Sequence, residues 1–230
     1  MSLSRRRFSA GLLGAGLVPG LAPIGAQGQT AAVVEGVHYV RLSEPVPAGG
    51  PGKIEVIEFF WYECPHCNAF EPALEAWSKR QPADVSLRRV PVFFREEPFG
   101  PQQRLYYAIE SLGLVETLHR RVFSAIHNEH LPMRRPDEMA AFMAKNGVDR
   151  EKFRAAFESF TVQAKAMQAR QTAAAYKIDA VPAMGVQGRY YTNGGLASSG
   201  APKQSTAVGN ERMLGVCDVL IERVRRGGKA

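Results

Sequence analysis

The chain has 230 residues, with 29 lysine and arginine residues against 22 acidic ones and a formal net charge of +7 at neutral pH. Its basic pairs are scattered and have acidic residues between them, so the sequence disfavours a nucleic-acid-binding surface. Three cysteines are too few for a scaffold stapled by disulfides. The composition therefore predicts thiols that are kept for chemistry.

The first residues have the pattern of an export signal. Arginines at 5–7 precede an apolar stretch over residues 10–18, and small residues follow around 24–26. We predict that residues 1–26 are a signal peptide of twin-arginine type, with a Sec signal as the alternative. That segment holds three arginines and no acidic residue, so the mature chain would carry +4. The expected destination is the periplasm, as a soluble protein.

The segment after this signal predicts a β-α-β unit. A short strand over residues 38–42 and a loop rich in proline and glycine precede a β-branched and aromatic strand over residues 54–60. Phe70, Leu74 and Trp77 then repeat at helical spacing until Pro82 ends the helix. The next strand, predicted over residues 84–92, would pair in parallel with the first because a helix connects them.

The remainder of the chain predicts helices followed by a return to strands. Gly188 joins two strands as a hairpin over residues 183–192, and a closing helix is expected over residues 206–226. Before the hairpin, helices are predicted over residues 102–112, 115–128, 136–145, 150–159 and 161–176. The fold class is therefore α/β, a thioredoxin-like fold with an inserted all-helical domain. Its predicted parts are residues 36–99 and 177–228, with the insertion over residues 100–176.

Cys64-Pro65-His66-Cys67 is the motif that carries the chemistry. It directly follows the predicted strand, which places Cys64 exposed at a helix N-terminus, with Cys67 about one turn further in. Amide groups and the helix dipole favour a thiolate at Cys64, and His66 adds a donor and a positive charge when protonated. Pro65 lacks an N–H and fits the first helical turn. A dithiol stabilised in its reduced form donates its disulfide readily, so the motif predicts an oxidase.

A zinc site is the other chemical interpretation of two cysteines at this spacing. It would need a second ligand pair, and Cys217 stands alone more than a hundred residues away. His127 and His130 have no thiol nearby, and we expect them to be solvated at the surface. We therefore predict no metal ligand and no metal or organic cofactor. Cys217 itself lies among apolar residues of the last helix, which predicts a buried and inert thiol.

Several motifs in order resemble the DsbA family of periplasmic thiol:disulfide interchange proteins. They are Glu58-Phe59-Phe60, Cys64-Pro65-His66-Cys67, Phe70-Glu71, Val181-Pro182-Ala183 and Gly188. The resemblance implies that Cys64 is the attacking cysteine and Cys67 the resolving one. It also implies that Pro182 is a cis-proline facing the dithiol and that the backbone of Val181 binds an extended substrate strand.

The resemblance further implies a function and partners. A valine before the cis-proline resembles the oxidase branch, and residues 27–52 are too few to build the dimerisation domain of the related isomerases. We expect a monomer that oxidises reduced client proteins and is reoxidised by a membrane quinone-linked partner. A reductase or isomerase on the same fold, and a peptide-binding holdase that keeps its disulfide for structure, remain as alternatives.

Two glutamates near the motif carry further expectations. Glu58 should share a strand face with Phe60 and point toward the dithiol, where it could accept the proton of Cys67. Glu55 alternates to the opposite face, so one of the two acids is expected in solvent. Arg88 and Arg89 both remain candidates for the basic partner of Glu58. Glu63, directly before the first cysteine, is expected to weaken the oxidant by repelling its thiolate.

Overall fold

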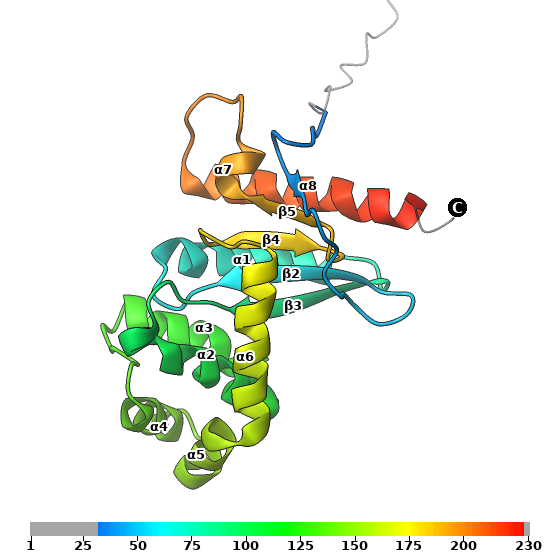
Figure 1. Cartoon of the computed structure of the whole chain (residues 1–230). Coiled ribbons are helices and arrows are strands. Elements are labelled where there is room, and N and C mark those ends of the chain that lie inside the picture. Colours follow the sequence, from blue (N-terminus) through cyan, green and yellow to red (C-terminus); the bar gives the residue numbers. More distant parts are fainter. Residues whose placement is uncertain (1–31, 228–230) are drawn as a thin grey trace, which may run out of the picture. The chain divides into compact units, whose positions relative to one another are not determined.

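The computed structural model describes residues 32–227, and of residues 96–99 the backbone alone. The elements in chain order are β1 (Val40–Arg41), β2 (Ile54–Phe60), α1 (Pro65–Lys79), β3 (Val85–Pro91), α2 (Glu96–Ser111), α3 (Val115–His127), α4 (Pro136–Lys145), α5 (Arg150–Glu158), α6 (Phe160–Ala175), β4 (Ala183–Val186), β5 (Tyr190–Asn193), α7 (Gly194–Ala197) and α8 (Thr206–Gly227) (Figure 1). The predicted signal peptide lies outside the described residues. Within them, none of the helices combines the length and the hydrophobicity that crossing a membrane requires.

The described strands form one five-stranded sheet in the order β1-β5-β4-β2-β3. β2 and β3 pair in parallel across α1, as the β-α-β pattern predicted, and the other neighbours are antiparallel. β2 lies near the middle of the sheet, and all seven of its residues are buried. The strand that leads into the Cys64 motif is therefore covered on both faces, which explains its nearly continuous apolar sequence.

One face of the sheet packs against α1 and α8. Val56 of β2, Leu74 of α1 and Leu220 of α8 are fully buried in the same hydrophobic cluster. The indole N–H of Trp77 on α1 also donates a hydrogen bond to Asp218 of α8, over 2.8 Å. Burying a side chain such as Leu74 contributes about 1.5–3 kcal/mol to folding, so this layer fixes the helix that carries the motif.

The other face of the sheet packs against the helical insertion, whose helices α2 to α6 lie between β3 and β4 in the sequence (Figure 1). Phe59 of β2 contacts Tyr176, which follows α6, with ring centroids 5.0 Å apart. Gly185 of β4 makes this possible, because a Cβ there would lie 2.4 Å from a ring carbon of Tyr176. The thioredoxin-like fold with an all-helical insertion is thus confirmed.

Three local predictions differ from the structure. The first strand is only Val40–Arg41, shorter than residues 38–42. The first inserted helix begins at Glu96 rather than at residue 102, because it continues across Gly100 and Pro101, residues that the sequence pattern reads as helix breakers. After the hairpin, the sequence Asn193-Gly194-Gly195 predicts a turn, but α7 begins there, because the side chain of Asn193 accepts a hydrogen bond from the Leu196 N–H over 2.9 Å.

Candidate active site

The dithiol motif lies where β2 passes into α1. Cys64 has an extended backbone and is the N-cap of α1, and Pro65 occupies the first helical position. The N–H of Cys64 donates to the carbonyl of Trp61 over 2.9 Å, which closes a tight turn between strand and helix. The helix start predicted from the sequence is therefore confirmed, and the first sulfur lies at the positive end of the helix dipole.

Cys64 is less exposed than predicted. Only 8% of its surface is accessible, because the loop before β4 covers it. Its thiol donates a hydrogen bond to the carbonyl of Val181, with 3.5 Å between Sγ and oxygen. The Val181–Pro182 peptide bond is cis, as the family resemblance implied. The two segments named from the sequence therefore meet at the nucleophilic sulfur, although more than a hundred residues separate them.

The local geometry stabilises a thiolate at Cys64. A hydrogen bond from the thiol of Cys67 lowers its pKa to about 6, with help from the backbone N–H groups of Cys67 and His66 and from the positive charge of His66. Burial opposes this shift. Cys67 is fully buried, and burial raises its pKa well above the ordinary value of 9.0. Of the two thiols, Cys64 is the one that ionises near neutral pH.

A cavity of about 450 Å³ opens beside the dithiol. His66 lines it from α1, and Val181 and Pro182 line it from the loop before β4. Its remaining walls come from α7, the loop that follows and the first turns of α8, and they carry mostly amides, hydroxyls and small residues. The cavity therefore adjoins the loop whose Val181 carbonyl contacts Sγ of Cys64.

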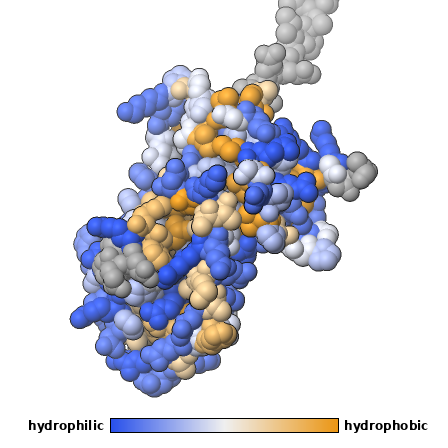
Figure 2. Space-filling view, in the orientation of Figure 1, coloured by the Kyte–Doolittle hydropathy of each residue, from blue (hydrophilic) through white to orange (hydrophobic). Residues whose placement is uncertain are grey.

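Aromatic side chains before the motif divide between core and surface. Phe60 and Tyr62 are buried, with ring centroids 5.1 Å apart. Trp61 is half-buried and contacts Phe94, of which 45% is exposed. The face of the molecule drawn in Figure 2 is mostly hydrophilic and is interrupted by hydrophobic patches. Phe60 and Tyr62 are thus core residues, whereas Trp61 and Phe94 contribute apolar surface near the motif.

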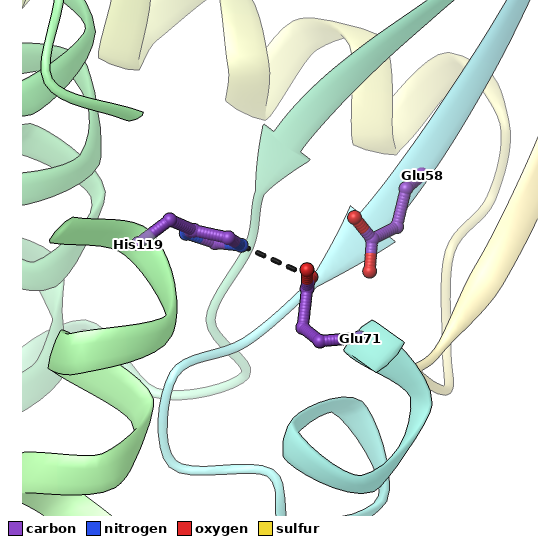
Figure 3. A group of neighbouring side chains, drawn as sticks. All are labelled: Glu58, Glu71 and His119. Carbon is purple, nitrogen blue, oxygen red and sulfur yellow. Dashed lines mark hydrogen bonds and ion pairs between the residues drawn. The ribbon is translucent and has the colours of Figure 1, made fainter. Parts of the chain in front are cut away.

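A buried ion-pair network lies behind the dithiol. Glu58 of β2 is fully buried and forms an ion pair with Nε of Arg89 on β3 at 3.2 Å. The same guanidinium donates through Nη2 to Glu71 of α1 at 3.0 Å. The other oxygen of Glu71 lies 3.0 Å from Nε2 of His119 on α3 (Figure 3). Three elements of the thioredoxin-like fold and one inserted helix therefore meet at a single cluster.

The surroundings shift the pKa values of Glu58 and Glu71 in opposite directions. Burial and the negative charge of Glu71 raise the pKa of Glu58. Burial would also raise the pKa of Glu71, but hydrogen bonds from His119 and Arg89 and the positive charge of Arg89 lower it to about 2. Glu58 is therefore the acid that holds a proton, and Glu71 is the anion. When Glu58 is ionised, its charge also raises the pKa of Cys67, so the two groups lie within electrostatic reach.

His119 completes the network through both ring nitrogens. Its Nδ1 lies 2.8 Å from the hydroxyl of Tyr62, and burial lowers its pKa. A neutral ring that donates from Nε2 to Glu71 and accepts from Tyr62 satisfies both contacts. Donor atoms of Glu58, Glu71 and His119 lie within 4.8 Å of one another, a spacing that a metal ion could bridge. Arg89 already supplies the positive charge there, so the arrangement fits proton chemistry better.

Comparison with known proteins identifies the family. A model of the DSBA-like thioredoxin domain matches residues 101–214. The chain is 41% identical to a thiol:disulfide interchange protein DsbA from Pseudomonas aeruginosa, over 84% of this chain and 87% of that one. It is also 41% identical to one from Burkholderia cepacia, over 85% and 90%. The crystal structure of Pseudomonas aeruginosa DsbA superimposes with a TM-score of 0.78, at 41% identity, over 86% of this chain and 97% of the other.

The chain belongs to the DsbA family. It is thus a thiol:disulfide oxidoreductase, and Cys64 and Cys67 are its paired cysteines. Three residues of the buried network were not assigned from the sequence: Arg89, Glu71 and His119. Arg89 was one of two candidates, and its register opposite Glu58 decides between them. Glu71 was quoted only as part of a family motif, and nothing in the sequence pattern of α3 distinguishes His119.

Several expectations about this DsbA-family site need correction. Both Glu55 and Glu58 are buried, whereas one was expected in solvent, because Arg88 pairs with Glu55 at 2.8 Å on the opposite face. His127 is half-buried rather than solvated, and its Nε2 lies 2.8 Å from the carbonyl of Tyr62. His130 is exposed, as expected.

Cys217 is buried in the core, and Glu63, the acid before the motif, contacts the helical insertion. Cys217 is fully buried in α8, and burial raises its pKa, which agrees with the expectation of a thiol without redox use. Glu63 directs its carboxylate to donors of the helical insertion. Its Oε1 accepts from the amide of Gln102 at 3.0 Å and lies 3.3 Å from Nε of Arg134.

Proposed function

We propose that this protein is a periplasmic dithiol oxidase that donates its Cys64–Cys67 disulfide to reduced, newly exported proteins. The observation that carries the proposal is the asymmetry between the two thiols: Cys64 ionises with a pKa of about 6, whereas burial raises that of Cys67. A thiolate stabilised in this way favours the reduced enzyme. The oxidised enzyme therefore gains free energy when it transfers its disulfide to a client.

The transfer proceeds in two exchanges. A client thiolate attacks Sγ of Cys64, the Cys64–Cys67 bond breaks, and a mixed disulfide forms while Cys67 leaves as a thiolate. Cys67 takes up a proton, for which Glu58 is the buried acid at hand. A second client thiolate then attacks the client sulfur of the mixed disulfide, and Cys64 leaves as the stabilised thiolate. The client is oxidised by two electrons, and the enzyme dithiol holds them.

The region around Val181 supports binding of an extended client segment. The carbonyl of Val181 lies 3.5 Å from Sγ of Cys64, and the adjoining cavity runs from His66 to α7 and α8. A client strand that pairs with the Val181 backbone would bring its cysteine beside Cys64. The half-buried Trp61 and exposed Phe94 offer apolar surface near the motif for unfolded clients.

A partner must reoxidise the dithiol after each turnover, and we infer a membrane quinone-linked protein from the family resemblance. The export-signal pattern at residues 1–26 supports a periplasmic site of action. We also infer a monomer, because the valine before the cis-proline resembles the oxidase branch of the family and not the dimeric isomerases. Reconstituted turnover with inner-membrane vesicles, in the presence and absence of added quinone, tests the recycling partner.

The direct test is oxidation of a reduced peptide that holds two cysteines. The oxidised protein should form the peptide disulfide stoichiometrically, and a variant with Cys64→Ser and Cys67→Ser should form none. An isomerase or reductase would instead reshuffle scrambled disulfides and show a reduction potential near that of thioredoxin. A holdase would bind unfolded peptide equally well in the double-serine variant. Either of these results would reject the oxidase proposal.

A further inference from the structure

The residue before the catalytic motif is an acid, which is an unfavourable neighbour for a thiolate. A carboxylate close to Cys64 would raise the pKa of its thiol by repulsion between like charges. The same repulsion would favour the disulfide over the dithiol and weaken the oxidant. Glu63 nevertheless directly precedes Cys64 in this chain, and 17% of its side chain is exposed.

The structure separates the two neighbouring side chains. Cys64 has an extended backbone, and Glu63 precedes it within the tight turn that the Cys64 N–H closes on the carbonyl of Trp61. The sulfur of Cys64 faces the carbonyl of Val181 in the loop before β4. The carboxylate of Glu63 instead contacts the helical insertion, at Gln102 of α2 and at Arg134 in the loop before α4.

Both partners of Glu63 are themselves fixed. Gln102 is 2% exposed, and its amide nitrogen lies 3.0 Å from Oε1 of Glu63. The backbone N–H of Arg134 donates to Glu138 at 3.0 Å, and Glu138 also accepts from the backbone N–H of Arg135 at 3.2 Å. Arg134 is thereby anchored to the first turn of α4, and its guanidinium reaches the carboxylate from a defined position.

We propose that Arg134 and Gln102 are positioning residues that hold the Glu63 carboxylate away from Sγ of Cys64 and so preserve the disulfide-donating strength of the pair. The inference rests on the proposed function, and it identifies residues that adjust how strongly the Cys64–Cys67 disulfide oxidises a client. The helical insertion, which contributes neither cysteine, thereby sets the oxidising strength of a dithiol on the thioredoxin-like fold.

The test is the equilibrium of each variant with glutathione, in which the reduced enzyme and oxidised glutathione exchange with the oxidised enzyme and two reduced glutathione molecules. Arg134→Ala should shift this equilibrium roughly twofold to fivefold toward the enzyme disulfide, the range expected for a partly exposed ion pair. Thiolate absorbance should show a matching rise in the pKa of Cys64. Arg135→Ala is the matched control, because it removes the same charge from the next residue.

Arg134→Ala could act by releasing the Glu63 carboxylate or by removing a positive charge near the Cys64 thiolate. Glu63→Gln distinguishes these two effects. In the native background it should change the glutathione equilibrium less than Arg134→Ala does. In the Arg134→Ala background it should restore the native equilibrium. Gln102→Met removes a donor without changing the net charge, and it should act in the same direction as Arg134→Ala and be rescued in the same way.

Three results would overturn the inference. Arg134→Ala and Arg135→Ala could shift the equilibrium equally, Glu63→Gln could fail to rescue, or Gln102→Met could have no effect in a folded protein. Failure of the proposed function would look different, because the native protein itself would then not oxidise the reduced peptide. Urea unfolding of each variant confirms that it is folded, and Gln102→Met keeps the test decisive if Arg134→Ala does not fold.

Discussion

Replacing Arg89 by methionine tests the buried network beside the dithiol. Arg89 is the cation that faces both acids, at 3.2 Å from Glu58 and 3.0 Å from Glu71. Only 12% of its side chain is exposed, so water cannot take over its role. Methionine keeps much of the apolar stem and removes the charge, which leaves two buried acids with a neutral His119 as their remaining polar partner.

The structure sets the size of the effect. The pKa of Glu71 is about 2 against an ordinary value of 4.5, a difference that corresponds to about 3 kcal/mol at neutral pH and that Arg89 and His119 share. Removing one partner of a buried ion pair destabilises a protein by about 3–5 kcal/mol. We expect Arg89→Met to lower the free energy of unfolding by about 3 kcal/mol at neutral pH.

The loss of stability in Arg89→Met should depend on pH, because Glu58 and Glu71 titrate. In the native protein, Glu71 contributes its full share to the free energy of unfolding above pH 4.5. That contribution is lost as the pH falls toward about 2. In Arg89→Met, burial raises the pKa of both acids, so the penalty is greatest at neutral pH and is relieved as they take up protons. The difference in unfolding free energy between the two proteins should therefore shrink as the pH falls toward about 4.

Urea unfolding of the reduced proteins, followed by circular dichroism, measures this difference. Arg120→Met is the control, because Arg120 of α3 pairs with Glu75 of α1 at 3.6 Å in a more exposed place, with 57% of its side chain accessible. That control should lose about 1 kcal/mol or less. Equal losses in the two variants, or a difference from the native protein that stays constant with pH, would refute the reasoning.

Three further predictions address the thiols and the buried acid. Glu58→Gln should be more stable than the native protein at neutral pH, because the raised pKa of Glu58 makes the native fold less stable as the pH rises above 4.5; urea unfolding at two pH values checks this. The same variant should slow the attack of reduced glutathione on the Cys64–Cys67 disulfide, which releases Cys67 as a thiolate that takes up a proton from Glu58, by about tenfold or more in stopped-flow measurements. Cys217→Ala should leave the glutathione equilibrium unchanged while lowering stability by about 1 kcal/mol, and a changed equilibrium would mean that Cys217 takes part in exchange.

The motif and its immediate geometry could be predicted from the sequence. A strand that leads into Cys64 with Pro65 next fixes a helix start, because few other local structures satisfy both residues. Strand alternation likewise placed Glu58 on the face of the dithiol. These predictions succeeded because they depend on neighbouring residues and on a periodicity that the sheet preserves.

The rest of the network could not be predicted, since it depends on register and on long-range packing. A shift of one residue between β2 and β3 would place Arg88, and not Arg89, opposite Glu58. His119 reaches Glu71 only because α3 packs against α1, a contact for which the sequence gives no local signal. The burial of Glu55 was missed for the same reason. It depends on an ion pair with Arg88, which lies on the opposite face of β3 from Arg89.

The proposed disulfide-donor activity depends most directly on the acidity of the Cys64 thiol. Titration of the ultraviolet absorbance of the thiolate in the reduced protein, with Cys64→Ser as the reference, measures it without any client or partner. We predict a transition at a pH of about 6 that is absent from the Cys64→Ser variant. A transition near the ordinary value of 9.0 would contradict the assignment of the protein as a disulfide donor.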